Sequence, residues 1–184
     1  MGLIVCGLNG SGKSTLGRAL ADHLGWRFID NEDLYFPDAA ADNKYATPRT
    51  EEQFLVLLAE ALHQDDRFVY AAVKADHAPA ITSRFTCAVL VDTPRDIRLR
   101  RVRERTLARS GSRALPGGDL CEQEQRFFAK ISARPEDYTA KWLNTLQIPV
   151  LHLDGTRPVA ENVARIVAWL REQGMDPAEK GIRP

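Results

Sequence analysis

Five short, mostly apolar runs recur along the chain, and each is followed by a polar or glycine-containing turn. They occupy residues 2–6, 26–29, 68–73, 87–91 and 149–153. Short apolar runs without strict alternation are typical of parallel strands that are buried on both faces. The pattern therefore predicts five strands of one sheet, and the segments between them must supply the helices that cover it.

Helical spacing marks the segments between these runs. Leu16 and Leu20 repeat at helical spacing after the first run, and Gly25 follows where a C-cap glycine belongs. A second helix is expected to begin at Thr50, because Gln53 three residues later gives the spacing of a capping box. A third helix is predicted to have Thr93 as its N-cap and Pro94 as its first residue. Three further helices are predicted to begin near residue 122, past residue 135 and at residue 158.

Two segments lack such patterns. Residues 39–48 are small and polar and are predicted to form a mobile loop, and residues 174–184 are predicted to form a loosely ordered tail. Residues 1–173 then make a single domain in which strands and helices alternate. This alternation predicts an α/β fold, with a parallel sheet covered by helices on both faces.

Composition narrows the class of protein. The 184 residues are 44% hydrophobic and 27% charged, with a formal net charge of zero, as in ordinary soluble domains. No global field favours nucleic acid or an anionic membrane, and no run approaches the roughly 18 apolar residues of a membrane span. The three cysteines form no C-x-x-C pair, and no signal peptide is expected. We expect a cytoplasmic monomer or homodimer with no nucleic-acid or membrane partner.

The turn after the first strand carries the clearest chemistry. Residues 7–14 read G-L-N-G-S-G-K-S and fit the pattern G-x-x-x-x-G-K-[ST], which wraps a nucleotide's phosphates. Its glycines let the backbone N–H groups approach phosphate oxygens, while Lys13 reaches the β- and γ-phosphates and Ser14 ligates Mg²⁺. The strand before it and the helix after it are the context this motif requires. The expected nucleotide-binding residues of the loop and the first helical turn are Asn9, Gly10, Ser11, Gly12, Lys13, Ser14 and Thr15.

Charged residues follow the other strands. Asp30, Lys74 and Asp92 each come directly after a predicted strand, and Gly155 comes just after the last one. Ligands of parallel sheets bind beyond the carboxyl ends of the strands, so these residues should share one rim with the phosphate loop. Magnesium prefers oxygen ligands and usually needs a carboxylate nearby, and both Asp30 and Asp92 compete for that role.

The segment after the second strand suggests how an acceptor is held. Glu32 and Asp33 are candidate general bases toward a hydroxyl group. Arg49 is a candidate clamp for an anionic acceptor, and Lys74 is expected to face the γ-phosphate or the acceptor. Each residue also has an ordinary alternative, namely a solvated turn, an N-cap or a surface cation.

An arginine-rich stretch follows the fourth strand. Residues 95–113 contain eight arginines against only Asp96 and Glu104. Such a run is usually a solvated helix face, but in a nucleotide enzyme it can also supply cations to phosphates. Arg101 and Arg105 lie four residues apart and therefore share one helix face. The further candidates for a closing lid are Arg109, Arg113, Arg126 and Arg134.

Together these features resemble small P-loop kinases of the gluconate kinase, shikimate kinase and nucleoside monophosphate kinase type. Residues 28–32, F-I-D-N-E, are similar to the F-x-D-x-D segment of shikimate and gluconate kinases. Residues 71–74, A-A-V-K, resemble the S-A-L-K of gluconate kinases, with the serine lost. Residues 101–105 resemble the R-x-x-x-R at the lid entrance of nucleotide kinases, and residues 154–156, D-G-T, match a loop that borders the base. The resemblance covers about residues 1–173.

The resemblance implies a three-layer α/β/α P-loop NTPase fold, with strand order 2-3-1-4-5 and a helical lid at about residues 106–134. It implies ATP and Mg²⁺ as cofactors. It favours Asp30 over Asp92 at the metal, because a carboxylate after the second strand serves the metal in gluconate- and shikimate-type kinases. It also implies that Arg101 and Gly155 lie against the base and Arg105 against the phosphates. The expected catalytic residues are Lys13, Asp30 and Arg105.

These features lead to one main hypothesis and leave others open. The main one is ATP- and Mg²⁺-dependent phosphotransfer to a hydroxyl group of a small metabolite. A nucleoside or nucleoside monophosphate kinase is the alternative that Arg49 and the lid arginines favour. A non-catalytic nucleotide-binding regulatory module and an antibiotic phosphotransferase are further alternatives. Glu32 replaces the second aspartate of F-x-D-x-D, and the glycine-rich acceptor loop of shikimate kinases is absent, so neither named substrate carries over.

Overall fold

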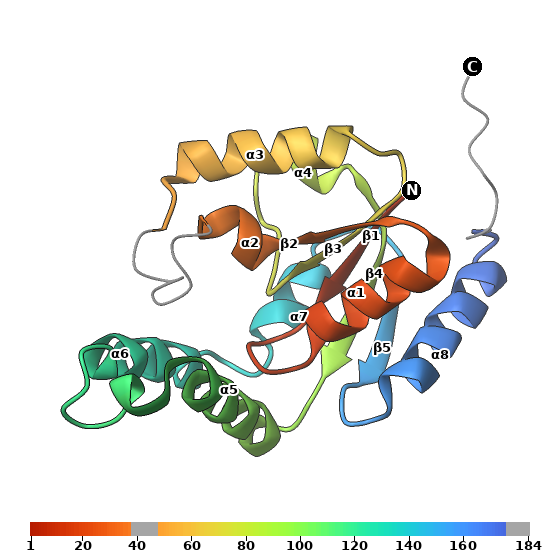
Figure 1. The fold of residues 1–184 in the computed structure, drawn as a ribbon. Coiled ribbons are helices and arrows are strands. Elements are labelled where there is room, and N and C mark those ends of the chain that lie inside the picture. Colours follow the sequence, from red (N-terminus) through yellow and green to blue (C-terminus); the bar gives the residue numbers. More distant parts are fainter. Residues whose placement is uncertain (38–47, 176–184) are drawn as a thin grey trace.

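The fold is a parallel sheet with helices on both faces (Figure 1). The computed structural model describes residues 1–37 and 48–175; residues 39–47 of the predicted mobile loop and 176–184 of the predicted tail lie outside this part. Every strand pairing is parallel, in the order β2-β3-β1-β4-β5, which confirms the predicted fold class and strand order. The strands are β1 (Gly2–Cys6), β2 (Arg27–Asp30), β3 (Phe68–Ala72), β4 (Phe85–Asp92) and β5 (Val150–Asp154).

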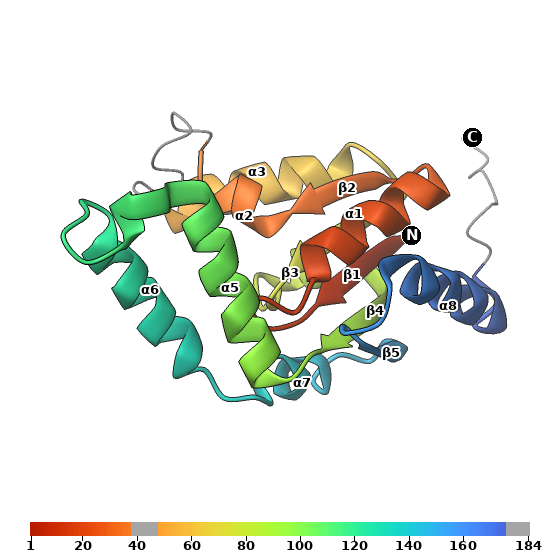
Figure 2. The same cartoon turned by 60° about the horizontal axis from the view of Figure 1, so that its bottom comes forward.

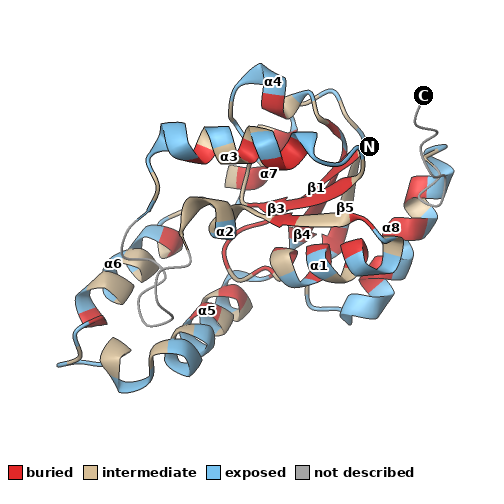
Figure 3. Cartoon of the chain, turned by 45° about the horizontal axis from the view of Figure 1, so that its top comes forward, coloured by how far each residue is buried: buried red, intermediate tan, exposed pale blue. Residues whose placement is uncertain are grey.

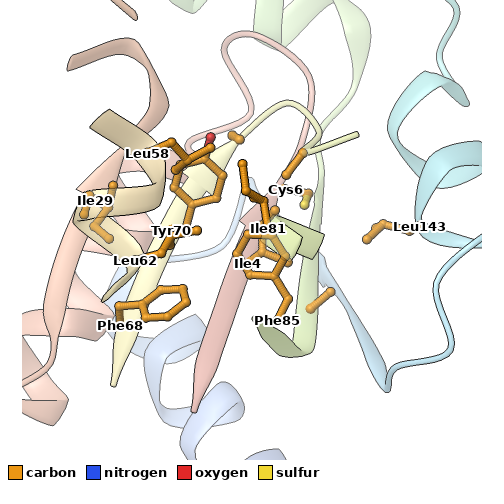
Figure 4. Close-up of a cluster of buried hydrophobic side chains, with 14 of the residues drawn as sticks. Ile4, Cys6, Ile29, Leu58, Leu62, Phe68, Tyr70, Ile81, Phe85 and Leu143 are labelled. Atoms are coloured by element: carbon orange, nitrogen blue, oxygen red, sulfur yellow. The ribbon is translucent and has the colours of Figure 1, made fainter. Parts of the chain in front are cut away.

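Two apolar layers flank the sheet. Helices α1 (Lys13–Leu24) and α8 (Val159–Glu172) cover one face, while α3 (Glu51–His63), α4 (Pro79–Thr82) and α7 (Tyr138–Leu143) cover the other. Figure 3 shows the central strands β1, β3 and β4 buried between them, whereas the edge strands β2 and β5 are only partly buried. In the second layer, drawn in Figure 4, the rings of Tyr70 and Phe85 stack with centroids 5.7 Å apart. No helix in residues 1–37 and 48–175 is long and apolar enough to cross a membrane.

Local signals set the ends of two helices as the sequence predicts. Gly25 ends α1 in the left-handed conformation, with φ 66°. Thr50 caps α3: its Oγ1 accepts a hydrogen bond from Gln53 N at 3.2 Å, and Gln53 Oε1 accepts one from Thr50 N at 3.1 Å. Both predictions are confirmed, because each depends only on residues within one turn of the helix end.

The predicted start of helix α5 (Arg95–Ser110) is wrong by one residue. Pro94, not Thr93, is the N-cap residue, with an extended ψ of 142°. Thr93 makes a different contact, since its hydroxyl donates a hydrogen bond to the carbonyl oxygen of Ser11 at 3.1 Å. A tertiary contact with the phosphate loop therefore replaces the local cap that the sequence suggested.

Two short helices were not predicted. Helix α2 (Asn31–Tyr35) occupies the carboxylate-rich segment after β2, and α4 follows β3. Neither is long enough to show a hydrophobic period. The sequence feature that marks the start of α2 is its N-cap residue, Asp30. Its Oδ1 accepts a hydrogen bond from Glu32 N at 2.9 Å.

A helical arm lies beside the phosphate loop. It consists of α5, the short 3₁₀ helix η1 (Gly111–Ala114) and α6 (Cys121–Ser132), and Figure 2 shows α5 next to the start of α1. An ion pair between Arg109 and Glu124 at 2.5 Å connects α5 to α6. The arm contains all but the last two residues of the segment at about residues 106–134 that the sequence analysis assigned to a lid.

Candidate active site

The phosphate loop runs from the end of β1 into α1 and depends on glycine at two positions. Gly10 and Gly12 have φ values of 84° and 97°, in the left-handed region that favours glycine. A Cβ atom at Gly10 would also lie 2.3 Å from the carbonyl oxygen of Arg98. The loop therefore packs directly against α5, and side chains at these positions would disrupt it.

Lys13, the first residue of α1, is only 6% exposed. Burial lowers the pKa of its amine, while the negative charges of Glu32 and Asp30 act in the opposite direction. The positive charge of Arg105 also lowers this pKa. Lys13, Asp30 and Glu32 line one cavity, and the charge of Arg105, an exposed arginine of α5, acts on the lysine from outside that lining.

A cavity of about 200 Å³ lies on the other side of the loop. Arg101 reaches across it: Nη1 and Nη2 donate to the carbonyl oxygen of Gly155 at 3.1 and 3.2 Å, and Nη1 approaches that of Ser11 at 3.4 Å. A Cβ atom at Gly155 would lie 2.1 Å from Thr93 Oγ1, so this turn also requires glycine. The lining residues are Ser11, Gly12, Thr15, Leu16, Val91, Arg101, Gly155, Arg157, Val159 and Asn162.

The candidate lid arginines separate into two groups. Arg109, Arg113 and Arg126 form ion pairs within the arm, with Glu124, Asp119 and Glu122 respectively. Arg134, just past α6, instead reaches the phosphate loop, where Nη1 donates to Asn9 Oδ1 at 2.7 Å. The sequence could not separate these arginines, because the choice depends on which carboxylates the fold places beside each one.

A larger cavity of about 520 Å³ opens next to Lys13. Its lining comes from the phosphate loop, the end of β2, helices α2, α3, α6 and α7, and the segment after β3. Charged groups of both signs line it together with aromatic rings. The polar lining residues are Asn9, Lys13, Asp30, Asn31, Glu32, Glu51, Lys74, Asp76, His77, Lys130 and Arg134, and the aromatic ones are Tyr35, Phe36, Phe54, Phe127 and Tyr138.

The two candidate metal carboxylates lie in different places. Asp30 lines the cavity that contains Lys13. The side chain of Asp92 is 62% exposed at the edge between β4 and β5, where its Oδ2 lies 3.2 Å from His152 Nδ1. Asp30 and the Ser14 hydroxyl are hard oxygen donors of the kind Mg²⁺ prefers. Within the described residues no three His, Cys, Asp or Glu side chains form a metal cluster.

The predicted acceptor residues are only partly brought together. Glu32 and Lys74 line the 520 Å³ cavity, whereas Asp33 and Arg49, both described, do not. Arg49 Nη1 donates to the main-chain oxygens of Leu34 at 2.6 Å and Asp33 at 3.3 Å, at the end of α2. Lys74 forms an ion pair with Asp76, in which its amine also donates a hydrogen bond to the carboxylate. This hydrogen bond raises the pKa of the Lys74 amine.

The sequence analysis missed several lining residues. Asp76 and His77 come shortly after Lys74, so the rule that ligands bind beyond strand ends could have found them. Phe54 lies on the buried face of α3, and its ring centroid is 5.1 Å from that of His77. An apolar residue on a helix face signals a core position, and nothing in the sequence distinguishes one that also borders a cavity.

Two known proteins are similar to this chain in sequence, and a solved structure is similar to it in fold. An uncharacterized protein of Bacillus subtilis (strain 168), YqaC, is 28% identical over 174 residues, which are 90% of this chain and 95% of that protein. A probable gluconokinase of Mus musculus is 32% identical over 101 residues, 53% of this chain and 49% of that protein. The crystal structure of shikimate kinase from Aquifex aeolicus is similar in fold, with TM-score 0.53 and 19% identity, over 95% of this chain and 99% of that one.

The family itself follows from a profile of related sequences. The sequence model of a protein family described as shikimate kinase matches residues 9–134, which are more than half of the chain. The matched segment begins in the phosphate loop and ends at Arg134, so it includes the helical arm and every lining residue of the larger cavity except Tyr138. This protein therefore belongs to the shikimate kinase family of P-loop small-molecule kinases.

Proposed function

We propose that this chain transfers the γ-phosphoryl group of Mg²⁺-bound ATP to a hydroxyl group of a small metabolite. One observation carries the proposal: a single cavity of about 520 Å³ is lined by Asn9 and Lys13 of the phosphate loop and by Asp30 and Glu32 after β2. Phosphoryl transfer needs donor and acceptor held together in one space, with groups that neutralise charge. This cavity supplies both requirements.

The donor side uses the phosphate loop. Its N–H groups bind the phosphates, Lys13 contacts the β- and γ-phosphates, and Ser14 and Asp30 hold the ion. Bound Mg²⁺ neutralises negative charge on the phosphates. Arg105, whose charge already acts on Lys13, stabilises the transferring group, since this reaction depends mainly on positioning and electrostatics. Arg101 lies against the base.

The acceptor side uses Glu32 as the general base. The hydroxyl oxygen of the acceptor forms a bond to the γ-phosphorus while the bond from that phosphorus to the oxygen of ADP breaks, and the hydroxyl proton passes to Glu32. Glu32 lines the cavity and acts electrostatically on Lys13. Because Asp33 lies outside the lining, Glu32 is the better placed of the two.

A phosphate acceptor is less well supported than a hydroxyl acceptor. Such an acceptor needs cations and no base. Arg49, which motivated the nucleotide-kinase alternative, is bonded to main-chain oxygens of α2, and Lys74 is already paired with Asp76. Lys130 and Arg134 also line the cavity, but it places the carboxylates of Asp30 and Glu32 beside the phosphate loop, which favours an acceptor that must lose a proton.

The arm of α5, η1 and α6 closes over the bound substrates in this proposal. Closure excludes water, so that the acceptor rather than water is phosphorylated. The segment at about residues 106–134 is then the lid of one domain that spans residues 1–173. Arg134 lies two residues past the end of α6 and already contacts the loop, which gives the lid a fixed end.

The test measures ATP consumption against a panel of sugar acids, polyols, nucleosides and nucleotides. A hit that Lys13→Ala abolishes would establish a kinase and its acceptor class. Glu32→Gln and Asp33→Asn then form a matched pair, and we expect about a hundredfold loss of kcat in the first and little change in the second. Equal and unchanged turnover in both would reject the hydroxyl-acceptor mechanism. ATP binding with no product from any acceptor would favour a regulatory module.

A further inference from the structure

The phosphate-loop pattern leaves residue 9 open, yet here its side chain has a defined partner. Asn9 is 8% exposed, and its Oδ1 accepts a hydrogen bond from Arg134 Nη1 at 2.7 Å. Phosphate binding by this motif uses main-chain N–H groups and the lysine, so it does not require the Asn9 amide. The side chain instead connects the loop to the chain segment that follows the arm.

The same segment is held to the loop's surroundings at a second point. Arg98 of α5 is 3% exposed, and its Nη2 donates to Glu136 Oε2 at 2.6 Å. Its Nε also donates to the carbonyl oxygen of Thr93 at 3.0 Å. A buried guanidinium needs a counter-charge, so the Arg98–Glu136 pair fixes residue 136 beside α5. Residues 134–138 are therefore held at both Arg134 and Glu136.

This segment reaches the wall of the acceptor cavity. Arg134 and Tyr138 both line the cavity. The Tyr138 ring has Arg134 Cζ 5.0 Å from its centroid and Lys74 Nζ 4.6 Å from it, within the range of cation–π attraction. Contacts therefore run without a gap from the phosphate loop to the segment after β3, through Asn9, Arg134, Tyr138, Lys74 and Asp76.

We propose that Asn9 is a positioning residue, which holds the Arg134 guanidinium in the space between the bound phosphates and the acceptor. An arginine side chain has many rotamers, and the hydrogen bond that Arg134 donates to the phosphate loop selects one of them. The Arg98–Glu136 pair keeps the main chain of this segment in reach of the loop. We call the hydrogen bond between Asn9 and Arg134 the tether. The expected effect of the tether on turnover rests on the proposed kinase function, but the tether itself does not.

The tether is tested on the ligand-free full chain by hydrogen exchange of residues 132–140. Asn9→Ala and Arg134→Gln should each speed exchange there about tenfold, because each removes a hydrogen bond to a charged group. The double variant should exchange no faster than either single variant, since both remove the same contact. Lys141→Gln is the matched control: it breaks an exposed pair with Asp137 in the same segment and should change exchange less than twofold.

The effect on turnover is measured with an acceptor from the panel. Asn9→Ala should lower kcat about tenfold, leave the KM for ATP within twofold, and have no effect in an Arg134→Gln background. Arg134→Gln leaves the loop sequence intact, so it tests the tether even if Asn9→Ala fails to fold. Unchanged exchange in either single variant, or effects that add in the double variant, would overturn the proposal. Coupled exchange without any product would reject the kinase function and leave the tether standing.

Discussion

The donor and acceptor halves of this site are built from different material. The phosphate-binding part of the donor half is one continuous stretch, residues 7–15, whose main-chain N–H groups and glycines define the geometry, while Arg101 and Gly155 border its base side. The acceptor half is made of side chains from β2, α2, α3, α6, α7 and the segment after β3. A local pattern is enough to specify the first, whereas the second exists only after the whole domain has folded.

This difference separates the residues that bind the phosphates of ATP from the residues that select the acceptor. Every ATP-dependent reaction of this kind needs the same phosphate cradle, and a motif of eight residues supplies it. Glu51, Asp76 and His77 line the 520 Å³ cavity outside the phosphate loop, so in our proposal acceptor choice depends on residues such as these. Substrate preference can therefore change among proteins of this fold while the donor half stays constant.

The largest effect should come from the donor half. Lys13→Ala removes a buried cation next to the phosphates, and we expect kcat to fall about a thousandfold or more, as for loss of other preorganised electrostatic contacts. Lys74→Ala is the matched variant in the acceptor half, and it should mainly raise the KM for the acceptor. Steady-state kinetics with varied ATP and varied acceptor would check both. Equal losses of kcat in the two variants would contradict the division between the halves.

The same division explains which features the sequence predicts. Strand order, the phosphate loop and the caps at Gly25 and Thr50 depend on short patterns or on the resemblance, and all agree with the structure. The predicted start of α5 was wrong, because Thr93 donates a hydrogen bond to the phosphate loop instead of capping the helix. The position of Arg49 at the end of α2 could not be foreseen either, since α2 itself gave no periodic signal.

The next largest effect concerns the boundary between the halves, where the metal is expected. Asp30→Asn should raise the Mg²⁺ concentration needed for half-maximal activity about a hundredfold, the upper end of effects for a group that tunes a metal site. Asp92→Asn is the control, because that carboxylate lies at the exposed edge of the sheet beside His152. A larger shift in Asp92→Asn than in Asp30→Asn would reverse the assignment. Titration of activity with Mg²⁺ and with Mn²⁺ measures both.

A smaller effect is expected on the base side of the donor half. Arg101→Gln loses the guanidinium that bonds Gly155 and borders the 200 Å³ cavity. We expect the KM for ATP to rise about tenfold, the scale of one cation–π or charged contact, with kcat almost unchanged. Calorimetric titration with ADP should show the same loss of affinity. Arg100→Gln is the control, since Arg100 makes an exposed pair with Glu104 on the same helix. An increased acceptor KM without any change for ATP would show that Arg101 serves the other half.

The smallest effect is expected at the N-terminal cap of α3, which lies away from the phosphate loop. A substitution there tests whether the acceptor half depends on this cap. Thr50→Ala removes the capping box of α3, the helix that brings Glu51 and Phe54 to the cavity. The free energy of unfolding should fall by about 1 kcal/mol, while Thr50→Ser, which keeps a capping hydroxyl, should stay close to the parent. Chemical denaturation measures both. Because none of the donor residues lies on α3, the KM for ATP should not change in either variant, whereas the acceptor KM should rise in the alanine variant alone. A parallel change in both KM values would show that α3 supports the two halves together.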